Sequence, residues 1–185
     1  MKAAKLIDIG KIVVEQVEKP VLTSDKQVLV KVKAVGLCGT DLHVFKEGRS
    51  DVVLPRIMGH ELSGVIEAVG VDVTNVKIGD HVILDPVISC GTCKICLKGH
   101  GNVCSYVKCF GVQCDGGFQE YIAVDSSKVF AYNKDVPFEI AALGEPFSIA
   151  SNILSRTNAK KGEKILIIGA GTIGLGIVQA AKGLG

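Results

Sequence analysis

The stretch SCGTCKICLKGHGNVC, residues 89–104, places four cysteines close together at the spacing C-x2-C-x2-C-x7-C. These are Cys90, Cys93, Cys96 and Cys104. Glycines in and after the run allow the backbone turns that direct several sulfur atoms toward one point. A structural zinc ion takes four tetrahedral ligands, and four thiolates are a usual closed set. We therefore predict a structural zinc site on a short loop-like lobe.

Disulfides and an iron–sulfur cluster compete with zinc as the reason for four thiols placed so closely. Cysteines three residues apart in a tight turn rarely reach disulfide geometry. The bacterial iron–sulfur pattern has three residues before its last cysteine and a proline after it, whereas seven residues intervene here and Ser105 follows. The iron–sulfur cluster stays open as the alternative. Cys109 is the only plausible substitute for Cys104, and we expect Cys109 and Cys114 to be free buried thiols.

The composition indicates an ordinary globular chain. Of its 185 residues, 48% are hydrophobic and 22% charged, which is enough apolar material to bury a core. The formal net charge of +2 is too small to indicate a nucleic-acid or anionic membrane partner. We find neither a signal peptide nor an apolar run of about 18 residues that could cross a membrane. Seven cysteines, four of them expected to bind metal, predict a reducing, cytoplasmic location.

The chain around the lobe is predicted to be rich in short strands. These strands are expected at residues 12–18, 28–35, 62–69, 81–84 and 119–124. They are rich in β-branched residues, several alternate with period two, and Gly, Asp, Asn and Pro separate them. Short strands at this spacing favour a small barrel or sandwich over a parallel sheet. One helical turn is expected after Cys38, capped by Thr40 or Asp41.

The pattern changes near Pro137. Residues 138–143 and 147–155 are predicted to be helical, and the apolar run 164–168 is predicted to be a buried strand. The sequence GAGTIG follows at residues 169–174 and leads into a predicted helix over residues 175–184. A strand, a glycine-rich turn and a helix in this order make the dinucleotide fingerprint.

In that fingerprint Gly169 makes the tight turn, Gly171 lets the backbone approach the pyrophosphate, and Gly174 allows close helix–strand packing. A plain strand–helix turn without a ligand is the alternative interpretation. A complete dinucleotide fold needs about six strands, and its ribose-binding acid comes about 20 residues after the glycines. Since neither fits before Gly185, we expect this chain to be a fragment or a truncated product of a longer enzyme.

A second set of candidate metal ligands occurs in three separate places. Cys38 lies in GLCGTDLH, His60 and Glu61 lie in MGHE, and Glu145 lies in LGEPF. A single cysteine is usually a small buried hydrophobe, so none of these residues is informative alone. Together they supply the thiolate, imidazole and carboxylate of a zinc site that keeps one position open for chemistry.

These motifs make the chain recognisable. GLCGTDLH, GHELSG, IGDHV, the four-cysteine lobe, GGFQEY, GEPF and GAGTIGL occur along its whole length. In this order they resemble the zinc-dependent medium-chain alcohol dehydrogenases, in the sorbitol (polyol) dehydrogenase-like branch. The resemblance implies a mainly β fold with α: a GroES-like β-barrel catalytic domain at residues 1–148. Residues 149–185 would then form a linking helix and the first βα unit of a truncated Rossmann domain.

The resemblance also implies roles for single residues. Cys38, His60 and Glu145 would hold the catalytic zinc, and Glu61 would lie beside it as an occasional or water-mediated ligand. Many alcohol dehydrogenases have a cysteine at the position of Glu145, and a glutamate there is similar to the polyol branch.

Two further residues would move the substrate proton. Thr40 stands where the family has the hydroxyl of the proton relay, and His43 lies near the outer end of that relay. The alternatives are a helix cap for Thr40, a surface histidine for His43 and a purely supporting role for Glu61.

The implied enzyme would transfer a hydride from a secondary alcohol (a polyol, sugar acid or sugar phosphate) to NAD(P)+. It would carry one catalytic and one structural zinc, and its full-length form would be a homo-oligomer. We expect the 185-residue chain to be inactive alone. The alternative is a non-catalytic, zinc-stabilised binding or scaffold module.

Overall fold

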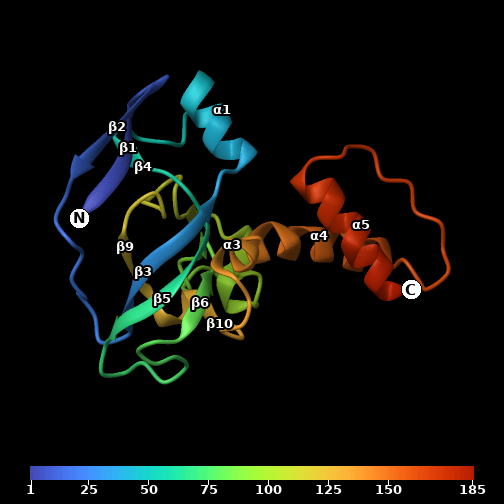
Figure 1. Ribbon diagram of the computed structural model, residues 1–185. Helices are drawn as coiled ribbons and strands as arrows, with labels where there is room; N and C mark the ends of the chain where they lie inside the picture. Colours follow the sequence, from blue (N-terminus) through green and yellow to red (C-terminus); the bar gives the residue numbers. More distant parts are fainter. The chain divides into compact units, whose positions relative to one another are not determined.

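The computed structural model describes residues 1–185, which divide into two compact units, Met1–Ala142 and Leu143–Gly185 (Figure 1). The predicted domains, residues 1–148 and 149–185, follow the functional domains of the family, whereas the two units observed here are defined by contacts. The predicted domain boundary therefore stays a prediction. No helix combines the length and the apolar character that a membrane crossing would need.

The first unit is built from short antiparallel strands. A five-stranded sheet has the order β10-β6-β5-β3-β9, a three-stranded sheet the order β2-β1-β4, and β7 pairs with β8. The strands are β1 (Lys2–Asp8), β2 (Lys11–Gln16), β3 (Gln27–Gly36), β4 (Arg56–Ile57), β5 (Glu61–Val69), β6 (His81–Leu84), β7 (Val87–Ile88), β8 (Lys108–Cys109), β9 (Tyr121–Asp125) and β10 (Val129–Ala131). The helices are α1 (Gly39–Glu47), α2 (Lys94–Leu97) and α3 (Phe138–Ala142), with 3-10 turns at Gly101–Val103 and Ser126–Lys128.

The core of this unit lies under the five-stranded sheet. Its members are β-branched and leucine side chains from five strands, each at most 8% exposed. They include Val28, Val30, Leu62, Ile66, Val82, Leu84, Ile122, Val124 and Val129. Full burial of each such side chain contributes about 1.5–3 kcal/mol. The buried core therefore stabilises the sheet and holds the residues at the ends of its strands in place.

The β3–β5 pair contains two irregularities, one at Leu29/Val30 and one between Val32 and Ala34. Bulges of this kind bend a strand and change the direction of the side chains that follow. Beyond the second irregularity Gly36, the last residue of β3, lies opposite Glu61, the first residue of β5. Two predicted metal ligands, Cys38 and Glu61, thus leave the sheet at the same end.

The five strands predicted from sequence are observed as β2, β3, β5, β6 and β9, within three residues at each end. The mixed β and α fold class is confirmed. Strand β1 was not predicted, because Lys2 and Lys5 interrupt its apolar pattern; Ala3 and Leu6 are nevertheless buried. The helix after Cys38 begins at Gly39 as expected, although it continues for nine residues rather than one turn.

The second unit contains two helices, α4 (Gly144–Thr157) and α5 (Thr172–Leu184), which pack against each other. A glycine at position 176 allows this approach, since a Cβ there would lie 3.0 Å from the Cβ of Ala150. The predicted buried strand at residues 164–168 is wrong: the segment forms no strand, and Leu166 and Ile168 are 86% and 92% exposed. The physical reason is that a strand needs a hydrogen-bonded neighbour, and none pairs with this segment.

Candidate metal centres

The four cysteines of the lobe converge on one point. Their sulfur atoms all lie within 4.8 Å of one another. The Sγ atoms of Cys93 and Cys96 are 3.5 Å apart, those of Cys90 and Cys96 3.8 Å, and those of Cys93 and Cys104 3.9 Å. Four sulfurs at about 2.3 Å from a tetrahedral zinc ion would be about 3.8 Å apart. The separations therefore fit one enclosed zinc ion, and no cysteine of the chain is in a disulfide.

The backbone of the lobe is arranged to support thiolates. The amide of Cys93 donates to Cys90 Sγ at 3.3 Å, the amide of Cys96 to Cys93 Sγ at 3.5 Å, and the amide of Tyr106 to Cys104 Sγ at 3.3 Å. Gly91 and Gly99 have φ values of 72° and 82°, the left-handed turns that the sequence predicts here.

These contacts shift the pKa values of Cys90 and Cys96 in opposite directions. Backbone amides of Thr92 and Cys93 lower the pKa of Cys90 to about 6. The loss of contact with water, together with hydrogen bonds to the neighbouring thiols, raises the pKa of Cys96 to about 12. Four negative charges do not fit in so small a space without a cation. The donor set thus suits a divalent ion with a strong affinity for sulfur.

A second convergence involves Cys38, His60 and Glu61. Their donor atoms lie within 4.8 Å of one another, although the residues come from the start of α1, the turn before β5 and the first position of β5. His60 and Glu61 are each 7% exposed, and Cys38 is half-buried. Three of the four predicted catalytic-zinc ligands are therefore neighbours. Glu145 lies in the first turn of α4, in the other unit, and its part in this centre stays a prediction.

Asp41 organises this cluster, and sequence reasoning considered it only as a helix cap. Its carboxylate is 1% exposed and accepts the amide of Cys38 at 2.9 Å and the amide of Gly59 at 3.2 Å. The same oxygen that faces Gly59 lies 3.9 Å from His60 Nδ1. Asp41 thus ties α1 to the turn that carries His60 and lies close to one nitrogen of its ring. In the sequence, this role could have been suspected from the position of Asp41, three residues after the candidate ligand Cys38.

The turn before His60 is fixed by a neighbouring segment. The amides of Gly117 and Phe118 donate to the carbonyls of Gly59 and Met58 at 2.7 and 2.9 Å. Gly59 has a φ of 89°, and a Cβ there would lie 2.8 Å from the Phe118 ring. A glycine is therefore required immediately before His60, both by the backbone and by the packing.

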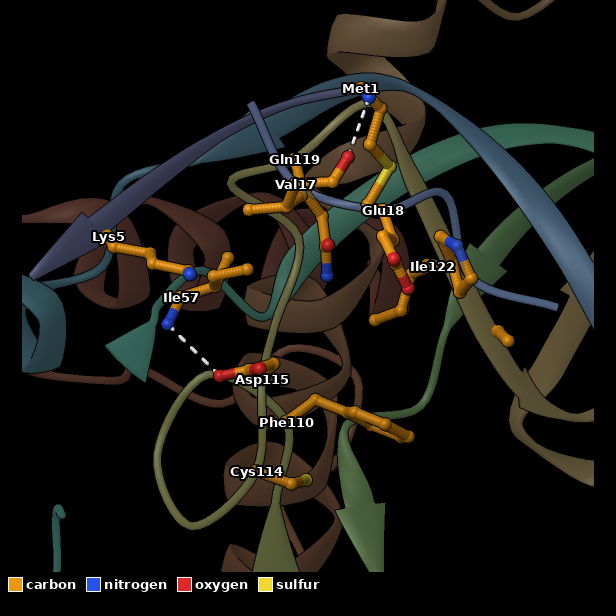
Figure 2. Close-up of a pocket in the computed structure, with 12 residues that line it drawn as sticks. Met1, Lys5, Val17, Glu18, Ile57, Phe110, Cys114, Asp115, Gln119 and Ile122 are labelled. Atoms are coloured by element: carbon orange, nitrogen blue, oxygen red, sulfur yellow. Dashed lines mark hydrogen bonds between the residues drawn. The ribbon is translucent and has the colours of Figure 1, made fainter. Parts of the chain in front are cut away.

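The first unit also contains a cavity of about 430 Å³, and Figure 2 shows the residues that surround it. At one side the Asp115 carboxylate accepts the amide of Ile57 at 3.1 Å, drawn as a dashed line in Figure 2, and it pairs with Arg56 at 2.9 Å. None of the predicted ligands lines this cavity, so it is distinct from both metal clusters.

The two predicted proton-relay residues lie on α1. Thr40 is half-buried in the first turn, and the Asp41 carboxylate, rather than the Thr40 hydroxyl, accepts the amide of Cys38. His43 is 52% exposed, with its Nδ1 3.4 Å from Glu47 Oε2. Their roles in catalysis stay predictions.

The glycine-rich turn has the backbone that the fingerprint needs. Gly169 has a φ of 110°, and Gly171 is the N-cap of α5 with open space where its side chain would be. A Cβ on Gly174 would collide with the carbonyl of Gly169 and lie 3.8 Å from Ile167. Only a glycine fits at that position, and no side chain caps the helix N-terminus beside Gly171.

Comparison with known proteins decides the family. Residues 24–134 match the model of the alcohol dehydrogenase GroES-like domain. The chain belongs to the zinc-dependent alcohol dehydrogenase family. The chain is 40% identical to the sorbitol dehydrogenase of Bacillus subtilis (strain 168) over 189 residues, which covers all of this chain and 53% of that protein.

Solved structures agree with this family. Galactitol-1-phosphate dehydrogenase from Escherichia coli superposes on all of this chain with a TM-score of 0.94 and 37% identity, over 53% of its own length. An alcohol dehydrogenase (rspB) from E. coli CFT073, solved with NADH, matches 99% of the chain and 53% of its own length, with a TM-score of 0.91 and 38% identity. The chain thus spans about half the length of these relatives, and its fold is GroES-like.

Proposed function

We propose that this chain carries the zinc-binding part of an NAD(P)-dependent dehydrogenase that oxidises a secondary alcohol of the polyol, sugar-acid or sugar-phosphate class. The observation that carries the proposal is the convergence of half-buried Cys38 with buried His60 and Glu61, whose donor atoms lie within 4.8 Å of one another. The names of two relatives, sorbitol dehydrogenase and galactitol-1-phosphate dehydrogenase, support the substrate class.

The donor chemistry fits zinc. A thiolate and an imidazole with one carboxylate make a three-ligand set that leaves a position for substrate, and their two negative charges balance the ion. In this proposal Cys38, His60 and Glu145 are the lasting ligands, and Glu61 exchanges with substrate or water. Zinc held there would act as a Lewis acid toward a substrate hydroxyl and lower its pKa.

The released proton would leave along α1. The Thr40 hydroxyl can both accept and donate a proton, and it lies two residues after Cys38. His43 follows at i+3 on the same face of the helix, where its half-exposed ring reaches solvent. Thr40 would accept the substrate proton while its own hydroxyl proton moves on toward His43, and His43 would release a proton to water.

The dinucleotide would supply the hydride acceptor. The open N-terminus of α5 at Gly171, with its unpaired amides and positive dipole end, would hold the pyrophosphate. The relative solved with NADH supports this class of cofactor.

Zinc content tests the proposal. We expect two zinc ions per chain by atomic emission after dialysis, one in Cys38→Ser and one in Cys104→Ser. Cys114→Ser is the matched control, since this half-buried thiol belongs to neither cluster, and it should keep both ions. Two ions in Cys38→Ser, or one in the unmodified chain, would contradict the proposal.

A further inference from the structure

Gly36 and Glu61 face each other across the β3–β5 pair. A Cβ built on Gly36 would overlap Oε2 of Glu61 and would lie 3.0 Å from its Cβ and 3.3 Å from its Cδ. All three nearest atoms belong to Glu61. The Glu61 side chain therefore folds across the strand pair and occupies the volume that any ordinary side chain at position 36 would fill.

The backbone does not explain why position 36 is glycine. Gly36 is outside the left-handed region that favours glycine, whereas the nearby Gly59 has a φ of 89°. Any residue can adopt the Gly36 conformation, so the position requires only the absence of a side chain. Directly opposite residues in antiparallel strands ordinarily have Cβ atoms about 4.5–5.5 Å apart. A Cβ on Gly36 would be only 3.0 Å from the Cβ of Glu61, well below that range.

The space left by Gly36 is adjacent to the metal cluster. Gly36 precedes Cys38 by two residues, and the carboxylate beside it lies within 4.8 Å of the donor atoms of Cys38 and His60. We infer that Gly36 is a positioning residue: it leaves the room in which the Glu61 carboxylate can stand at the metal centre as an oxygen donor. This inference rests on the proposed function and assigns a task to a residue that touches neither metal nor substrate.

The consequence of adding one methyl group follows from the distances. In Gly36→Ala the carboxylate must move by on the order of 1 Å to reach an ordinary contact. Such a shift would move the Glu61 carboxylate out of reach of a metal ion held beside it, since zinc–oxygen bonds are only about 2.0–2.2 Å long. We expect the affinity of this centre for a divalent metal to fall about 10–100-fold, as for other residues that orient ligands. The four-cysteine site should keep its affinity.

Cobalt titration of the zinc-free chain measures this effect. Co2+ absorbs in the visible range, and its spectrum separates a four-thiolate site from a single-thiolate one. The matched control is Gly39→Ala, because a Cβ at Gly39 meets nothing within 4 Å and its φ is also outside the left-handed region. Gly36→Ala should weaken the single-thiolate site and change its absorption, while Gly39→Ala should match the unmodified chain.

Several outcomes would overturn the inference. One is a Gly36→Ala titration identical to that of the unmodified chain; another is unchanged affinity in Glu61→Ala. If the unmodified chain forms only the four-thiolate site, the proposed function fails first, and that result is visible before any variant is made.

A double variant covers the case in which Gly36→Ala fails to fold. In Gly36→Ala/Glu61→Ala the carboxylate is gone, and only the Cβ–Cβ approach of 3.0 Å remains. The two strands then need to separate by only a few tenths of an ångström, so folding should return. The added methyl group should change cobalt affinity by less than about twofold relative to Glu61→Ala. A double variant that stays unfolded, or that is further weakened, would show that Gly36 acts through another contact.

Discussion

Asp41 gives the sharpest prediction for stability. Replacing it with alanine leaves the amides of Cys38 and Gly59 without their acceptor, at a position where the carboxylate is 1% exposed. Each unsatisfied buried amide costs about 1–3 kcal/mol. The small cavity left by the side chain adds to this loss. We expect Asp41→Ala to lower the free energy of unfolding of the first unit by about 3–5 kcal/mol.

Urea unfolding followed by circular dichroism measures this difference, with both proteins saturated with zinc. Asp135→Asn is the control, since Asp135 is exposed and its carboxylate has no tertiary contact. The variant should also bind Co2+ more weakly at the Cys38–His60 centre, because the two ligand-bearing segments lose their link. If the free energies of unfolding of Asp41→Ala and Asp135→Asn differ by less than about 0.5 kcal/mol, the Asp41 carboxylate does not join the two segments.

Three further predictions concern other parts of the chain. Glu145→Ala should lose the catalytic zinc and keep the structural one; two ions per chain by atomic emission would contradict its assignment. Hydrogen bonding to Arg49 lowers the pKa of Asp51, so Asp51 stabilises the fold above its ordinary pKa, and this is lost as pH falls through the lowered value. Asp51→Asn should thus cost less than about 1 kcal/mol at pH 7, and progressively less as the pH falls below the ordinary pKa of a carboxyl group, by urea unfolding. Leu166→Lys should change the free energy of unfolding by less than about 0.5 kcal/mol, since Leu166 is 86% exposed. A larger loss would show that Leu166 packs against other residues.

The features predicted well from sequence are those that local spacing determines. The short spacings between Cys90, Cys93 and Cys96 restrict their sulfurs to a small volume, and the glycines around them allow the necessary turns. The strands that contribute to the core could also be predicted, because few structures other than a strand are compatible with alternating β-branched residues. Cys38 and His60 are predicted as ligands from their motifs, and in the structure their donor atoms lie within 4.8 Å of each other.

The features that sequence reasoning missed depend on contacts between distant residues. Asp41 matters because Gly59, 18 residues away, donates to it. Gly36 matters because Glu61 lies across the sheet, and no local pattern reports that a side chain must be absent. The run at 164–168 has the composition of a buried strand but no strand to pair with, so composition alone gave the wrong structure.

X-ray absorption at the zinc edge can decide whether the chain holds two zinc centres of different composition. We predict two ions per chain that share five sulfur ligands, four in the lobe and one from Cys38, with nitrogen and oxygen completing the second site. The average is about 2.5 sulfurs per zinc. One ion per chain with four sulfurs around it would contradict this assignment, because the imidazole–carboxylate centre would then hold no metal.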